Sequence, residues 1–187
     1  KDPTRKITDW TRRFLSQTSG TTDTEEFLLA ITHAIRDEFK YSARYEPGVQ
    51  SPVEMLENGT GTCRDYALFM MEAARSVGLA ARFVSGYLYD PALENRPAGN
   101  PDPGPSEISG AGSTHAWAQI YLPGAGWVEF DPTNGSYGGH NLVPIAVARE
   151  PEQALPVSGT YDGDAEDFIE MSVSVTVSAR NTLEGVA

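Results

Sequence analysis

The sequence has one cysteine, three histidines and no long apolar run. A single cysteine excludes an internal disulfide, and with three scattered histidines it also excludes a cysteine-based zinc cage. No apolar stretch approaches the roughly 18 residues of a membrane-spanning helix. The first residues, KDPTRKITDW, lack the apolar core of a signal peptide. We therefore expect no metal, no membrane span and, by default, a cytoplasmic location.

Basic residues are also scarce, since 14 Lys and Arg stand against 26 Asp and Glu and give a net charge of −12. The excess lies near the C-terminus, where residues 150–187 carry eight acids and Arg180 is the one base. Because such a surface repels phosphate backbones and anionic lipids, we expect neither nucleic acid nor a membrane as partner. The acidic run Asp162–Asp167 is interpreted as a solvated turn rather than a cation site.

The length and composition indicate one folded domain. The chain has 187 residues, of which 40% are hydrophobic and 21% charged, which suffices for a single core. We expect residues 1–187 to form that domain. Because the chain begins on a charged stretch rather than a Met, it is interpreted as a piece of a longer protein.

The order of predicted elements indicates the fold class. Helices are expected over 4–17, over 22–40 and from Cys63 to about Gly78, and residues 41–62 are expected to form a loop with at most a short helix at 52–58. Strands are expected over four stretches rich in β-formers: 81–89, 115–122, 127–131 and 171–177. Helices followed by adjacent strands predict an α+β fold with an antiparallel sheet.

Three separated segments carry the residue types that nucleophilic acyl transfer needs: GTGTCRDYA at 59–67, STHAWAQIYL at 113–122 and GWVEFDPTNG at 126–135. Cys63 begins a predicted helix, where the helix dipole and free backbone N–H groups favour a thiolate. His115 begins one predicted strand and Asp131 ends the next. A carboxylate beside a histidine fixes its tautomer and stabilises the imidazolium.

The turn between these two strands decides whether His115 and Asp131 can meet. A three-residue loop at Pro123–Ala125 pairs Leu122 with Gly126. His115 and Asp131 are then diagonal neighbours on one face, with Cβ atoms about 7 Å apart. A four-residue loop would place them on opposite faces. The spacing permits a Cys–His–Asp triad without requiring one.

These segments, together with GLAARFVSGY at 78–87, resemble the bacterial branch of the transglutaminase-like superfamily over residues 22–159. The resemblance implies a papain-like cysteine fold, with the nucleophile at a helix N-terminus packed on the antiparallel sheet. In it Cys63 is the nucleophile, His115 the general base and acid, and Asp131 the residue that orients the histidine. It implies no cofactor and no calcium. Because members of this branch carry a β-rich domain before the core, it also implies that this chain is a catalytic fragment.

The expected activity is acyl transfer from an amide of a protein or peptide to water or a primary amine, through a thioester on Cys63. Two alternatives stay open. One is a catalytically inert peptide-binding module on the same fold. The other is a redox-sensing thiol, which the lack of a resolving cysteine argues against. His33 and His140 are expected to be non-catalytic.

The oxyanion of an acyl-transfer intermediate requires hydrogen-bond donors. The backbone N–H of Cys63 is the first expected donor, because it lies at the start of a helix. Tyr41 and Gln50 are candidates for the second donor by position, and Tyr41 also matches an aromatic residue common in the family. Asp65 lies in the first turn of the same helix, where the helix dipole alone accounts for an acid.

Residues 90–114, with five prolines and four glycines, run directly into His115. We expect this segment to form one wall of the substrate groove, and the alternative is a tolerated surface insertion. Replacing Pro97–Pro105 with a brief Gly-Ser linker should change the acylation rate or the substrate preference while the melting temperature stays the same. Unchanged kinetics toward a panel of peptides and amines would identify the segment as an insertion.

Overall fold

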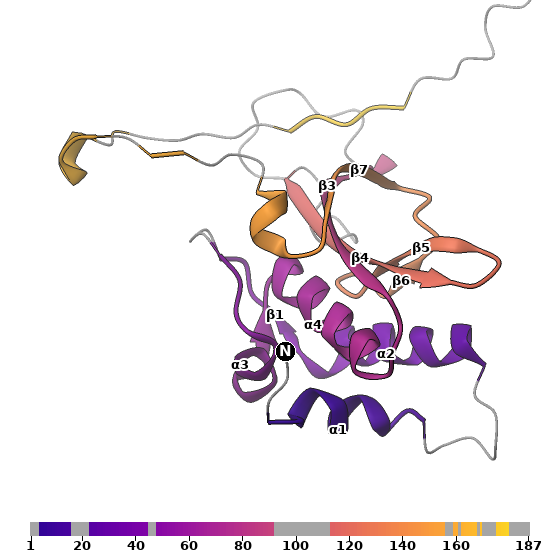
Figure 1. Ribbon diagram of the computed structural model, residues 1–187. Coiled ribbons are helices and arrows are strands. Elements are labelled where there is room, and N and C mark those ends of the chain that lie inside the picture. Colours follow the sequence, from indigo (N-terminus) through magenta and orange to yellow (C-terminus); the bar gives the residue numbers. More distant parts are fainter. Residues whose placement is uncertain are drawn as a thin grey trace, which may run out of the picture.

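The computed structural model describes residues 4–15, 23–44, 48–91 and 113–155, and the short stretches 159–160, 162–167, 169 and 175–179. The helices of these ranges come first: α1 (Lys6–Arg12), α2 (Thr24–Glu38), α3 (Pro52–Asn58) and α4 (Cys63–Ser76). The main sheet follows: β3 (Ala81–Leu88), β4 (Thr114–Leu122), β5 (Gly126–Asp131), β6 (Ser136–Tyr137) and β7 (Leu142–Ala148). Its strand order is β6-β5-β4-β3-β7 with antiparallel neighbours (Figure 1), which confirms the α+β class.

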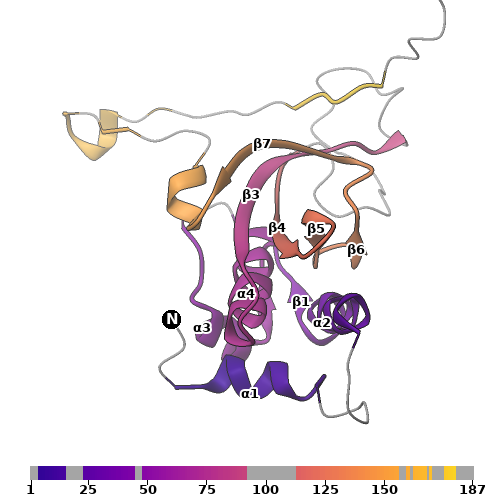
Figure 2. The same ribbon diagram turned by 45° about the vertical axis from the view of Figure 1, so that its right-hand side comes forward.

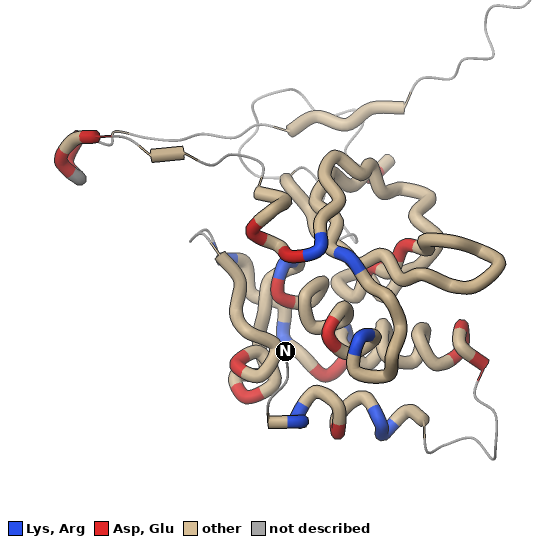
Figure 3. Tube along the Cα trace, viewed as in Figure 1, with Lys and Arg blue, Asp and Glu red and all other residues tan. Residues whose placement is uncertain are grey.

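Shorter elements complete the description. Strands β1 (Lys40–Tyr41) and β2 (Thr60–Gly61) pair in parallel and connect the helical region to the start of α4. Two 3-10 turns follow the sheet, η2 (Pro151–Ala154) and η3 (Ala165–Asp167). In the view of Figure 3, η3 belongs to an acidic turn that stands apart from the sheet and the helices. None of the described helices is long and apolar enough to cross a membrane.

Helix α4 lies between the sheet and the other helices (Figures 1 and 2). One buried cluster joins its apolar residues to the β4 residues Ala116, Ala118 and Ile120. On its other side Trp10 of α1 meets Phe69 edge to face, with ring centroids 4.8 Å apart. Because α4 is packed on both sides, the position of its N-terminus is fixed by the core.

The local sequence determines where α4 begins and ends. Thr62 is the N-cap: its side chain accepts the backbone N–H of Asp65, and the Asp65 carboxylate accepts the N–H of Thr62. This reciprocal capping box stabilises the helix start. Gly78 follows the C-cap with a φ of 89°, a left-handed conformation that favours glycine. Cys63 is therefore the first residue of α4, as the sequence predicts.

The β4–β5 hairpin has the register predicted for a three-residue loop. Leu122 pairs with Gly126, and Ala118 pairs with Phe130. The three predicted strands between residues 81 and 131 are confirmed, with ends within about one residue, and the loop over 41–62 does contain a short helix at 52–58.

Some expectations need correction. Helix α1 is shorter than the predicted 4–17, while residues 16 and 17 lie outside the described ranges. Residues 175–177 of the strand predicted at 171–177 are described and lie outside any strand. Strand β7 is not predicted by the sequence pattern, since LVPIAVA lacks alternation and contains Pro144. It lies at the sheet edge, where proline is tolerated. Most of the 90–114 segment lies outside the described residues.

Gly86 permits a close approach at the centre of the sheet. A Cβ atom there would lie 2.1 Å from the carbonyl oxygen of Val143 and 2.8 Å from Cη2 of Trp117. We expect Gly86→Ala to reduce the free energy of unfolding by about 1–3 kcal/mol or more, because overpacking forces backbone shifts. Gly159→Ala is the control, since nothing lies within 4 Å of its Cβ position. Equal denaturant midpoints for the two variants would contradict the prediction.

Candidate active site

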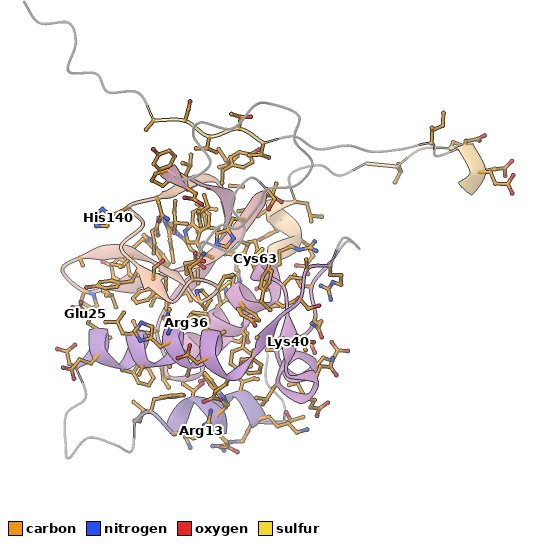
Figure 4. The ribbon with its side chains drawn as sticks, turned by 180° about the vertical axis from the view of Figure 1, so that it is seen from behind. Arg13, Glu25, Arg36, Lys40, Cys63 and His140 are labelled. Atoms are coloured by element: carbon orange, nitrogen blue, oxygen red, sulfur yellow. The ribbon has the colours of Figure 1, made fainter. Side chains whose placement is uncertain are left out.

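Cys63 lies at the positive end of the α4 dipole. Its side chain is free and 8% exposed. Figure 4 shows it where the helical layer meets the sheet, whereas His140 lies at the outer side of the strands. The first N–H groups of a helix lack intrahelical acceptors. They and the dipole therefore stabilise negative charge on the sulfur.

His115 connects Cys63 to a carboxylate. It is 1% exposed, and its Nε2 lies 2.9 Å from Oδ2 of Asp131. Nε2–H is the donor to this carboxylate, because an ionised carboxylate can only accept. The other ring nitrogen, Nδ1, has no partner of ordinary hydrogen-bond geometry among the described residues. The imidazole also interacts with the thiol of Cys63. His115 therefore lies between the sulfur and Asp131, as the diagonal register permits.

Asp131 is fully buried and accepts several hydrogen bonds. Its Oδ1 accepts the N–H of Thr133 at 3.0 Å, and its Oδ2 accepts Nδ2–H of Asn134 at 2.8 Å. Burial acts to raise the pKa of Asp131, but His115, Asn134 and Thr133 lower it below its usual value. Asp131 thus begins an Asx turn and orients His115 at the same time. No spacing in the sequence singles out Asn134 as a site residue, although the segment DPTNG indicates a turn there.

The environment of His115 favours the imidazolium. Burial acts to lower the pKa of His115, but the hydrogen bond to Asp131 and the interactions with Cys63 raise it to about 10. The imidazole of His115 is therefore protonated at neutral pH when Asp131 and Cys63 carry negative charge. An imidazole held by a carboxylate beside a cysteine is the arrangement that nucleophilic catalysis by a thiol uses.

Of the two candidate oxyanion donors, Tyr41 lies next to Cys63. The pKa of Tyr41 is raised by burial and by the neighbouring sulfur, so its hydroxyl stays protonated. Gln50 is different, because its Nε2 donates to the carbonyl oxygen of Thr60 at 3.0 Å and contacts Asp65 at 3.3 Å. Both amide hydrogens of Gln50 therefore have acceptors within the protein, which argues against a direct contact with an oxyanion.

Asp65 organises the N-terminus of α4. It is 1% exposed. Its Oδ1 accepts the backbone N–H of Gln50 at 2.6 Å and a guanidinium N–H of Arg44 at 3.1 Å. Its Oδ2 accepts the N–H of Thr62 at 2.8 Å. Asp65 therefore joins Gln50, which precedes α3, to Thr62, which precedes Cys63. These bonds account for an acid at this position in addition to the helix dipole.

The described residues contain no group of three His, Cys, Asp or Glu side chains placed to hold a metal ion. The side chains of the site can themselves supply acid, base and nucleophile. The thiol supplies a nucleophile, His115 supplies or accepts a proton, and Asp131 keeps the imidazole in one tautomer.

Comparison with known proteins finds relatives along most of the chain. A family model described as the transglutaminase-like superfamily matches residues 10–132. An uncharacterised protein of Mycobacterium tuberculosis is 30% identical over 158 residues, which cover 80% of this chain and 46% of that protein. A protein-glutamine gamma-glutamyltransferase of Pseudomonas aeruginosa is 31% identical over 111 residues, which cover 59% of this chain and 14% of that protein. The chain thus spans about half the length of the mycobacterial relatives it matches.

Solved structures share the fold. A proposed cysteine protease from Cytophaga hutchinsonii gives a TM-score of 0.57 at 22% identity, over 80% of this chain and 45% of that one. LapG from Legionella pneumophila gives a TM-score of 0.50 at 16% identity, over 79% of this chain and 76% of that one. At these identities the likeness shows the fold alone, which is the papain-like arrangement expected from the sequence.

The raised pKa of His115 makes stability depend on pH. A group whose pKa is raised by folding stabilises the protein fully below its unfolded value of 6.5, and this stabilisation is lost as the pH rises to about 10. We expect the difference in unfolding free energy between wild type and His115→Gln to fall by a few kcal/mol over that range. Urea unfolding at several pH values measures it. If the difference in unfolding free energy does not change with pH, the pairing of protonated His115 with Asp131 is contradicted.

Proposed function

Because this chain belongs to the transglutaminase-like superfamily, which includes cysteine peptidases and acyltransferases, we propose that it is a thiol-dependent enzyme that transfers acyl groups from amides. The observation that carries the proposal is the position of His115, whose imidazole bonds to Asp131 through Nε2 and interacts with Cys63. A buried histidine in a purely structural role has no need of both a carboxylate and a thiol.

The reaction proceeds in two steps. The Cys63 thiolate attacks the carbonyl carbon of the amide, the C–N bond breaks, and His115 gives its proton to the departing amine. The product of this step is a thioester on Cys63. Water or a primary amine then attacks the thioester and loses a proton to His115, which releases the acyl product and restores the thiolate–imidazolium pair. Asp131 keeps the ring oriented throughout.

The tetrahedral intermediates place negative charge on the former carbonyl oxygen. We assign its stabilisation to the backbone N–H of Cys63, at the start of α4, and to the hydroxyl of Tyr41. Tyr41 suits this role because its raised pKa keeps it a donor beside the sulfur. Gln50 supports the site indirectly by binding the carbonyl oxygen of Thr60.

The substrate is an amide of a protein or peptide, and the acceptor is water or a primary amine. The names of two relatives support this range. The Cytophaga protein is a proposed protease and the Pseudomonas protein transfers glutamyl groups. Both activities use the same first step, so they differ only in the acceptor that reaches the thioester.

Mass spectrometry tests the proposal. The protein is incubated with a peptide library, with and without a primary amine, and followed for an acyl adduct on Cys63 and for released products. Cys63→Ala should abolish both, and His115→Ala should slow product formation by about 10²–10⁴-fold, the usual contribution of general acid–base catalysis.

The matched control is His140→Ala, which removes a histidine that lies away from the thiol. It should leave the rates unchanged. Equal rates for His115→Ala and His140→Ala would contradict the role of His115. The absence of any adduct or product in every mixture would contradict an enzymatic function.

A further inference from the structure

Trp117 lies beside His115 and Asp131. It follows His115 by two residues in β4, so the two side chains share one face of the sheet. Extending the β4–β5 register by one residue beyond the pair Ala118–Phe130 places Asp131 opposite Trp117. Trp117 is fully buried, and the mechanism above does not use it. Its contacts show a second role besides filling the core.

The six-membered ring of Trp117 is held against β3. A Cβ at Gly86 would lie 2.8 Å from Cη2 of the indole, so the ring packs directly on the backbone of this glycine. Gly86 is also the residue paired with His115 in the β3–β4 register. The absence of a side chain at this position therefore lets the indole reach the histidine.

The other end of the indole faces Glu129. The indole Nε1 and Oε2 of Glu129 are both buried, and neither has a partner of ordinary hydrogen-bond geometry among the described residues. Burial raises the pKa of Glu129, while Gln119, Arg82 and the indole N–H of Trp117 oppose that rise.

Glu129 is itself held by a row of side chains from β4 and β3. Its Oε1 accepts Nε2–H of Gln119 at 2.7 Å, and Oε1 of Gln119 accepts Nε–H of Arg82 at 2.6 Å. This row runs across β5, β4 and β3, and it fixes the carboxylate that the indole N–H approaches. Both ends of the Trp117 ring are thus constrained.

The ring of Trp117 lies against that of His115, with centroids 6.0 Å apart and planes inclined by 27°. Asp131 holds one atom of the imidazole, and a single hydrogen bond leaves the ring free to tilt about it. Catalysis needs Nδ1 to face the sulfur of Cys63 while Nε2 faces Asp131. A flat neighbour on one side removes the tilt.

We propose that Trp117 is a positioning residue that fixes the plane of the His115 imidazole, and that Glu129 acts through the indole N–H of Trp117. This inference rests on the proposed function of Cys63 and His115. A residue that only fills the core would change stability without changing the reactivity of the thiol, so the two roles can be separated.

The structure provides a matched control. Trp10 is also buried, and its indole Nε1 donates to a carboxylate oxygen of Glu38 at 3.0 Å. Trp10→Phe therefore removes the same indole N–H from a buried tryptophan that lies on α1, in the helical layer. Trp117→Phe, Glu129→Gln and the double variant are compared with it. The readout is the rate constant for alkylation of Cys63 by iodoacetamide at pH 7, measured on protein shown to be folded.

We expect Trp117→Phe to slow alkylation by about tenfold and Glu129→Gln by about threefold, because small misplacements of a catalytic group are costly. Trp10→Phe should stay within twofold of wild type. If Glu129 acts through the indole, the double variant should match Trp117→Phe. If the charge of Glu129 acts directly on the site, Glu129→Gln will also slow alkylation in the absence of the indole. The effects of the two substitutions would then add in the double variant, which would overturn the claim that Glu129 acts through Trp117.

Two further results would overturn the proposal. One is a folded Trp117→Phe that reacts within twofold of Trp10→Phe. The other, which decides the matter if Trp117→Phe does not fold, is a Glu129→Gln rate equal to wild type. His115→Ala serves as the reference. If it leaves alkylation unchanged, the proposed function fails, whereas a slow His115→Ala with a fast Trp117→Phe rejects only the positioning role.

Discussion

The buried pair of Asp131 and His115 is the interaction on which the rest of the site depends. An isolated buried charge is costly, so both groups must be satisfied inside the protein. Asp131 has His115, Asn134 and the N–H of Thr133 as donors. The β4–β5 register and the turn after β5 are therefore both required to place these donors around one carboxylate.

The helical layer supports this turn. His33 of α2 bonds through Nε2 to the carbonyl oxygen of Gly135 at 3.1 Å. Gly135 has a φ of 67°, and a Cβ there would lie 2.4 Å from a guanidinium nitrogen of Arg36. The turn that carries Asn134 thus packs directly on α2. A second buried carboxylate, Asp65, anchors the other half of the site at the start of α4.

What the sequence predicts well is local. The start of α4 follows from a cap at Thr62, and the spacing of the hairpin permits His115 and Asp131 to share a face, although only the structure decides between the two turn lengths. The bonds of Gln50 could not be predicted, because its acceptors come from Thr60 and Asp65 and depend on tertiary contacts.

Other features that the sequence pattern does not predict also depend on tertiary contacts. Strand β7 lacks alternation because it is an edge strand with a proline, and only its pairing with β3 defines it. The relation of Trp117 to Glu129 likewise depends on sheet register and on the space left by Gly86. Neither has a signal in spacing along the chain.

The central claim is that Asp131 holds His115 as an imidazolium beside the thiol. Nitrogen NMR of protein labelled in its histidines, assigned with His33 and His140 variants, measures it directly. At pH 8, well above the ordinary histidine pKa of about 6.5, both ring nitrogens of His115 should be protonated in wild type. In Asp131→Asn the ring should lose a proton by that pH. A neutral His115 ring at pH 8 in wild type, unchanged in Asp131→Asn, would contradict the account.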